Sequence, residues 1–185
     1  QSDEVKGMVR TLGLSDEFTL YSVFIMRNWE NGNTEIMNIA KSVNGWGKVH
    51  AVHYIEPDTE EIKYWLLTDA VSNDVMPAYS GWDCYKKADV ESVIKKDKLS
   101  YKELEGVLSI IDAMLDEGPV LGISNIEDPK EVLLNVLNHA IKHAPLSAKD
   151  CKIISNILDW KKENLVDENG EIELLANQIF EAGRR

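Results

Sequence analysis

Apolar and polar positions alternate along most of this chain with the period of an α-helix. After Ser100, Asp128 and Ser147, apolar side chains recur at intervals of three and four residues and form continuous stripes. A repeat of 3.6 residues places such side chains on one face of a helix. The second half of the chain is therefore predicted to form helices that begin near residues 101, 129, 148 and 171.

In the first half of the chain, the apolar pattern predicts shorter helices over residues 3–12, 34–43 and 73–87. It also predicts a very short helix after Asp89. The segment from Ser15 to Trp29 is apolar almost all round, which predicts a helix buried on several sides. A strand reading of its centre, YSVFIM, competes with this interpretation. The acidic residues that follow Ser15, and the length of the segment, favour a helix.

Residues 45–67 predict a helical hairpin. Pro57 cannot continue a helix, and Asp58 is a suitable N-cap for the next one. Trp65 lies in the middle of the apolar stripe of the second helix and is expected to be buried. Trp46 lies between Gly45 and Gly47, where we expect a turn.

Short turns between eight to ten helices predict an all-α fold without strands. The later helix starts, near residues 101, 129, 148 and 171, are spaced for pairs of helices of about 40–50 residues, and the pairs Gly45-Trp46 and Gly81-Trp82 lie 36 residues apart. This spacing predicts a right-handed α-solenoid of antiparallel helical hairpins, with a compact multi-helix bundle as the alternative. We expect a single domain over residues 1–185, with a weak subdivision near residues 95–100.

The chain resembles a HEAT/armadillo-like helical repeat protein over most of its length. The resemblance rests on the hairpin spacing, on Pro57-Asp58 and Asp128-Pro129 at helix starts, and on small or apolar inward positions. The chain departs from the usual pattern because its second helices lack a recurring Asp-Val-Arg run. The resemblance implies a scaffold built from stacked hairpins.

The net charge of −12 is spread over the whole chain of 185 residues. A diffuse negative field opposes phosphate binding, so a nucleic-acid partner is unlikely and a basic protein partner is favoured. No apolar run approaches the roughly 20 residues that a membrane span requires, so no membrane association is expected. Cys84 and Cys151 form no metal-binding or redox motif, and we predict a reduced, cytoplasmic protein.

No catalytic motif is present, so no catalytic residue, cofactor or metal ligand is assigned. Phosphate-binding loops, GxSxG and HExxH are all missing. His50 with His53, and His139 with His143, each share a helix face. Four imidazoles that converge on one metal would make a metal-dependent hydrolase, although a surface pair near a helix C-terminus, where the helix dipole favours histidine, is the preferred interpretation.

Clustered aromatic residues give the best candidate for a binding site. Exposed tryptophan and tyrosine side chains are common anchors for protein partners, although they can also simply close the core at hairpin turns. The predicted partner-binding residues are Trp46, Lys48, His50, Trp82 and Tyr85.

These observations favour a non-enzymatic helical scaffold that binds another protein. A bacterial immunity-type protein or a regulatory interaction protein would be a concrete form of it. A helical-repeat nucleic-acid-binding protein or DNA base glycosylase is one alternative, and a metal-dependent hydrolase is the other.

Overall fold

The computed structural model describes residues 2–184, and within that range it contains only helices and their connections. The prediction of an all-α protein is therefore confirmed. The helices, in chain order, are α1 (Asp3–Gly13), α2 (Asp16–Met26), α3 (Gly32–Ser42), α4 (Gly45–Tyr54), α5 (Glu60–Thr68), α6 (Ala78–Lys87), α7 (Val90–Ile94), α8 (Tyr101–Leu115), the 3₁₀ helix η1 (Ile123–Asn125), α9 (Pro129–Lys142), α10 (Ala148–Asn164) and α11 (Glu171–Ala182).

Capping residues determine where several of these helices begin. Ser100 and Glu103 form the predicted capping box at the start of α8. Asp58 was the wrong choice of cap for α5. Its carboxylate accepts a hydrogen bond from Asn33, and the neighbouring Thr59 caps the helix instead.

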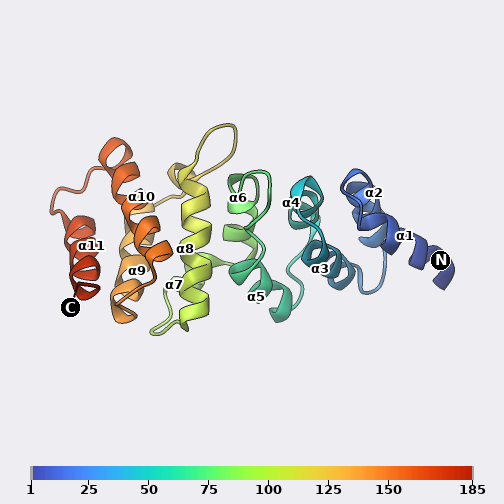
Figure 1. Cartoon of the computed structure of the whole chain (residues 1–185), viewed down its shortest axis with the longest axis horizontal. Coiled ribbons are helices and arrows are strands. Elements are labelled where there is room, and N and C mark those ends of the chain that lie inside the picture. The colour runs from blue at the N-terminus through green and yellow to red at the C-terminus, as the bar shows by residue number, and fades with distance from the viewer. Residues whose placement is uncertain (1, 185) are drawn as a thin grey trace.

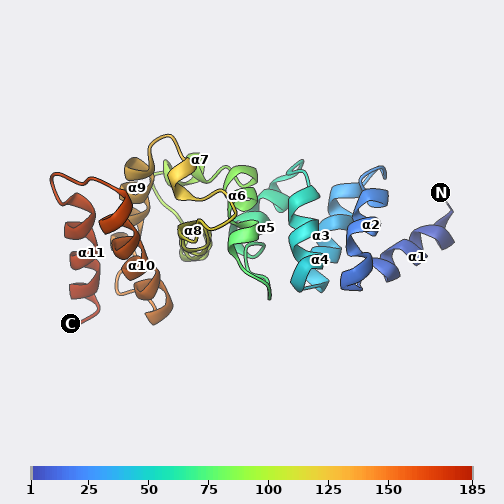
Figure 2. The same ribbon diagram turned by 90° about the horizontal axis from the view of Figure 1, so that it is seen from above.

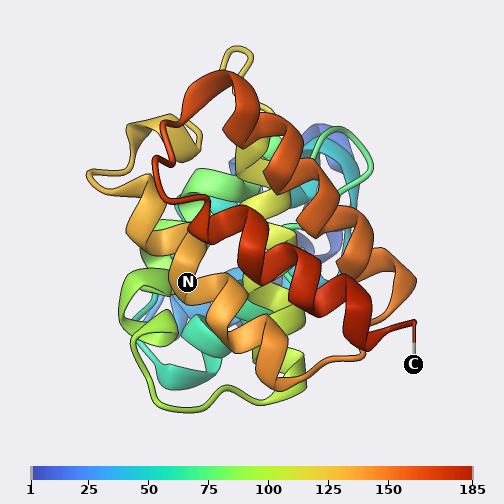
Figure 3. The same ribbon diagram turned by 90° about the vertical axis from the view of Figure 1, so that its left-hand side faces the viewer.

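The helices follow one another along the long axis of the molecule, with the two termini at opposite ends (Figure 1, Figure 2). Helices α2, α4, α6, α8 and α10 form a row in which each packs against the next. The remaining helices flank this row, and α9 packs on both α7 and α11. Figure 3 looks along the row from its C-terminal end, where α11 lies in front. The domain subdivision near residues 95–100 stays a prediction.

A contiguous hydrophobic core runs through the row of helices. Leu104 and Leu108 of α8 are completely buried, as is Leu66 of α5. Gly106 allows this close crossing of α8 and α5, because a Cβ atom at that position would collide with the backbone carbonyl of Leu67.

The prediction that α2 is buried on several sides is wrong. Only Thr19, Ser22, Val23 and Met26 of this helix are buried, and they lie on one side of it. Tyr21 is 65% exposed, and Phe18 is 48% exposed. Helix α2 is thus buried on one face and presents an apolar face to solvent.

None of the helices within residues 2–184 combines the length and the apolar content that a membrane crossing requires.

Replacing Gly106 by alanine should lower the free energy of unfolding by about 1–3 kcal/mol, because α8 and α5 must then move apart. Gly7 in α1 is the matched control, since nothing lies within 4 Å of a Cβ atom placed there. Gly7→Ala should raise stability by about 0.5–1 kcal/mol through its better helix propensity. Urea unfolding of the two variants measures both effects, and equal effects would contradict this account of the crossing.

Candidate functional site

Helices α4 and α6 lie side by side and run in the same direction. Trp46 at the start of α4 contacts Tyr79 at the start of α6, and His53 near the end of α4 bonds to Asp83 further along α6. Ring-bearing side chains recur on the outward face of both helices at helical spacing. We call this set the α4–α6 aromatic surface, and its members are Trp46, His50, His53, Tyr54, Tyr79 and Trp82.

Trp46 is the most exposed tryptophan that the aromatic surface offers to a partner. Its side chain is 45% exposed, and its ring centroid lies 5.0 Å from that of Tyr79 at an interplanar angle of 45°. The His50 ring lies 6.1 Å away on the next turn of α4. This tilted contact holds the indole in one orientation while much of its surface remains open to solvent.

The two glycines around Trp46 explain its position. Gly45 has a φ of +61°, and a Cβ atom at Gly47 would lie 2.6 Å from Oγ1 of Thr19 in α2. The backbone N–H of Gly47 donates a hydrogen bond to the Asp16 carboxylate, so a side chain of α2 caps α4. Trp46 therefore lies in the first turn of α4, rather than in the expected turn, and points away from α2.

Polar contacts and one ring contact hold the end of the aromatic surface that lies around His53 and Tyr54. Nδ1 of His53 lies 2.8 Å from the carboxylate of Asp83, and Nζ of Lys87 lies 3.6 Å from the same carboxylate. The ring of Tyr54 packs on Phe24 of α2, with 4.7 Å between the centroids. These contacts fix α4 against both α2 and α6.

Trp82 lies in the middle of α6, and its ring is already covered on one side. Nζ of Lys86 lies 5.4 Å from the Trp82 ring centroid, which is the geometry of a cation–π contact. The preceding Gly81 faces Ala113 and Met114 of α8. Gly81-Trp82 and Gly45-Trp46 thus occupy different positions in their helices, and their 36-residue spacing does not mark equivalent sites.

Two of the five predicted partner-binding residues lie outside this surface. Tyr85 is 1% exposed, and burial raises the pKa of its phenol. Lys48 lies on the opposite side of α4, where its Nζ donates a hydrogen bond to the carbonyl oxygen of Asp69. Partial burial there lowers the pKa of Lys48. The structure brings Trp46 and His50 together and adds Tyr79, whereas the Trp82 ring stacks on the buried Tyr85, with 6.2 Å between the centroids.

The four histidines do not converge. Nε2 of His139 lies 3.0 Å from the carbonyl oxygen of Ile94, and Nε2 of His143 lies 2.9 Å from that of Leu99. Because a carbonyl only accepts, each ring donates a hydrogen bond and holds the connection between α7 and α8. His53 bonds to Asp83 on another part of the molecule. Among the described residues, no three His, Cys, Asp or Glu side chains are placed to hold a metal ion.

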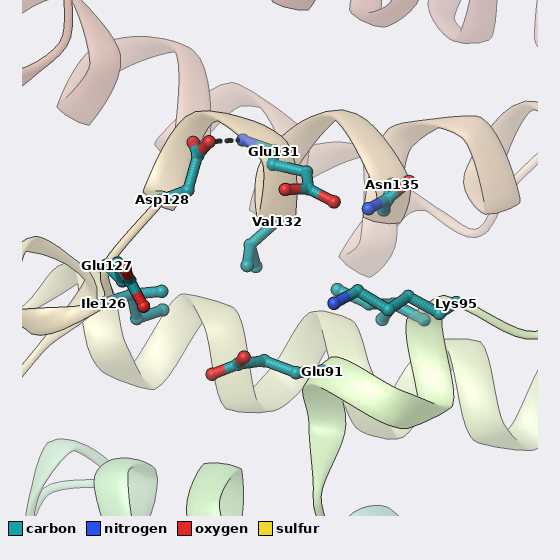
Figure 4. A pocket seen from close by; sticks show the side chains of 9 residues that line it. Glu91, Lys95, Ile126, Glu127, Asp128, Glu131, Val132 and Asn135 are labelled. Atoms are coloured by element: carbon teal, nitrogen blue, oxygen red, sulfur yellow. Dashed lines mark hydrogen bonds between the residues drawn. The ribbon is translucent and has the colours of Figure 1, made fainter.

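A cavity of about 380 Å³ lies between α7, α9 and the loop before α9. Figure 4 shows Glu91 of α7 and Lys95, which directly follows this helix, on one side and Glu131 of α9 on the other. Asp128 accepts a hydrogen bond from the backbone N–H of Glu131 and thereby caps α9. Helix capping accounts for the position of these two acids, and we assign no ligand to the cavity.

Comparison with known proteins returned no relative: no protein-family model, no curated protein and no solved structure matches the chain. The HEAT/armadillo-like resemblance therefore stays a prediction.

Replacing Asp16 by alanine should destabilise the protein by about 1–2 kcal/mol, because the start of α4 loses its cap. Glu17→Ala is the matched control, since Glu17 lies in the same first turn of α2 and bonds only locally to Ser15. Thermal unfolding followed by circular dichroism measures the difference. Equal losses for the two variants would show that the contact between Asp16 and Gly47 contributes nothing.

Zinc should leave the thermal unfolding midpoint unchanged, because the histidine rings that would bind it are engaged elsewhere. A metal that binds only the folded state raises its stability by mass action, so the midpoint reports binding. The measurement compares protein in excess zinc with protein in a chelator. An upward shift in zinc that disappears in the His139→Gln variant would restore the metal hypothesis.

Proposed function

We propose that this protein is a non-enzymatic scaffold that binds another protein through the α4–α6 aromatic surface. The observation that carries the proposal is the exposed pair of Trp46 and Tyr79, held in contact on adjacent helices. Tryptophan and tyrosine dominate the binding energy of many interfaces, because they bury a large area at little conformational cost. A bacterial immunity-type protein or a regulatory interaction protein would use such a surface.

The charge of the chain supports a basic partner. A net charge of −12 attracts positively charged proteins over long range and accelerates their encounter. Aromatic ring faces add a local attraction for lysine and arginine side chains. Lys86 already occupies the face of Trp82, so the rings of Trp46 and Tyr79 are the ones to receive a partner's cation.

The arrangement of the helices supports an α-solenoid of the HEAT/armadillo type rather than a compact bundle. Helices α4 and α6 are parallel and packed together, as corresponding helices of successive hairpins would be. The order of the helices along the long axis follows their order in the chain (Figure 1). The right-handed sense of the solenoid stays a prediction.

The two alternative functions receive less support. A nucleic-acid-binding protein or base glycosylase needs a basic face to contact phosphates, and the excess of acidic residues extends over both halves of the chain. A mobility-shift assay at low salt tests this alternative directly. The metal-dependent hydrolase depends on four histidines. Three of them bond to separate parts of the molecule, and the fourth, His50, packs beside Trp46.

The proposed function predicts that removing the Trp46 and Tyr79 rings weakens partner binding. The immobilised chain should capture a basic protein from extract of its source cells, and the binding of that purified protein can then be titrated. Trp46→Ala combined with Tyr79→Ala should weaken binding about 30-fold or more, as expected for a binding hot spot. Higher salt should also weaken it, because the attraction is partly electrostatic.

Tyr64→Ala is the matched control for this experiment. Tyr64 is 49% exposed on α5, outside the aromatic surface, so its removal should leave affinity unchanged. Equal binding by the double variant and the control would refute the assignment of the surface. Capture of no specific protein, or of an acidic one only, would argue against the proposed function itself.

A further inference from the structure

Lys48 lies outside the aromatic surface, in a cavity on the other side of α4. The cavity has a volume of about 470 Å³ and is lined by side chains of α3, α4 and α5 and by the residue that follows α5. Its size is that of a site for a small molecule. The lining residues are two lysines, two acids and two aromatic residues, namely Lys41, Lys48, Glu61, Asp69, Tyr64 and Trp65.

Both acids of this cavity are already paired with other lysines. The carboxylate of Asp69 lies 2.8 Å from Nζ of Lys102, and the carboxylate of Glu61 lies 3.7 Å from Nζ of Lys41. Nζ of Lys48 instead donates a hydrogen bond to the backbone carbonyl oxygen of Asp69, at 3.2 Å. Lys48 is thus the lysine of the cavity that has no carboxylate of its own.

This arrangement sets Lys48 apart from the other lysines that are partly or fully buried in the described chain. Four of them lie within 3.6 Å of a carboxylate, and the fifth lies 5.5 Å from the ring centroid of Trp29. These five are Lys63, Lys87, Lys130, Lys161 and Lys6. Partial burial disfavours the charged ammonium of Lys48 and lowers its pKa. A larger fraction of this amine is therefore neutral and nucleophilic at pH 7 than of an exposed lysine.

The cavity favours a neutral ligand with an aromatic ring. Its two lysines are matched by two acids, and the chain as a whole carries a net charge of −12, so an anion gains little there. Tyr64 is 49% exposed and Trp65 lies beside it in the wall, so both offer ring surface for stacking.

We propose that Lys48 is a covalent binding site for a small aromatic aldehyde, which enters this cavity and forms an imine with Nζ. The neutral amine attacks the carbonyl carbon, and a proton moves from nitrogen to oxygen. The resulting carbinolamine loses its hydroxyl group and its remaining N–H proton as water. No oxidant or reductant is needed, and hydrolysis returns the free lysine. The proposal does not depend on the aromatic surface or on the proposed function.

Reductive trapping measures this reaction at each lysine. The folded protein is incubated briefly with benzaldehyde and cyanoborohydride near pH 7, and cyanoborohydride supplies the hydride that turns an imine into a stable secondary amine. Peptide mapping by mass spectrometry then gives the labelled fraction of each lysine. Lys149 is the matched comparator, because its exposed Nζ also lies 3.2 Å from an uncharged partner, Oγ of Ser109. Lys48 should be labelled at least about 10-fold faster than Lys149.

Two variants separate binding in the cavity from the reactivity of the amine. Lys48→Arg keeps the positive charge and should abolish the preferred label. Tyr64→Ala removes an exposed ring and should lower the preference for Lys48 about 3-fold or more with benzaldehyde. It should leave the preference unchanged with formaldehyde, which has no ring. Equal labelling of Lys48 and Lys149, or a preference that is the same for both aldehydes and survives Tyr64→Ala, would overturn the proposal.

Discussion

The close packing of α4 on α2 is the contact on which the candidate site depends. Gly47 brings the start of α4 against Thr19, and the Asp16 carboxylate caps α4 across the same contact. If α4 began one turn later, or lay further from α2, the Trp46 ring would point in another direction. The residues that make the aromatic surface usable are therefore small or polar groups beneath it.

The local structure could largely be predicted from the sequence. Apolar stripes at 3.6-residue spacing located the long helices, and Ser100 with Glu103 located the start of α8 within one residue, because capping is a local interaction. The prediction that Asp58 caps α5 failed for a tertiary reason. Asn33, which is distant in sequence, binds the Asp58 side chain and removes it from the helix end.

The candidate site could be predicted only in part. The spacing of His139 and His143 shows that they share a helix face, but not that this face packs against the connection between α7 and α8. Tyr85 has the same polarity as Tyr79, and only the neighbouring helices decide which of the two is buried. Apolar residues on all sides of α2 led to the prediction that this helix is buried on several sides. The prediction was wrong because composition does not show whether the chain itself covers a given face.

A row of helices distributes its stability unevenly, and α1 occupies the weakest position. Its buried residues are Val9 and Gly13, and the ion pair between Arg10 and Glu35 ties it to α3 at the surface. Exposed ion pairs contribute little, so α1 is expected to open more often than the central helices. Amide hydrogens of α1 then exchange with solvent ahead of those in α8. The end of the molecule that presents the most apolar surface is thus also the end that opens most easily.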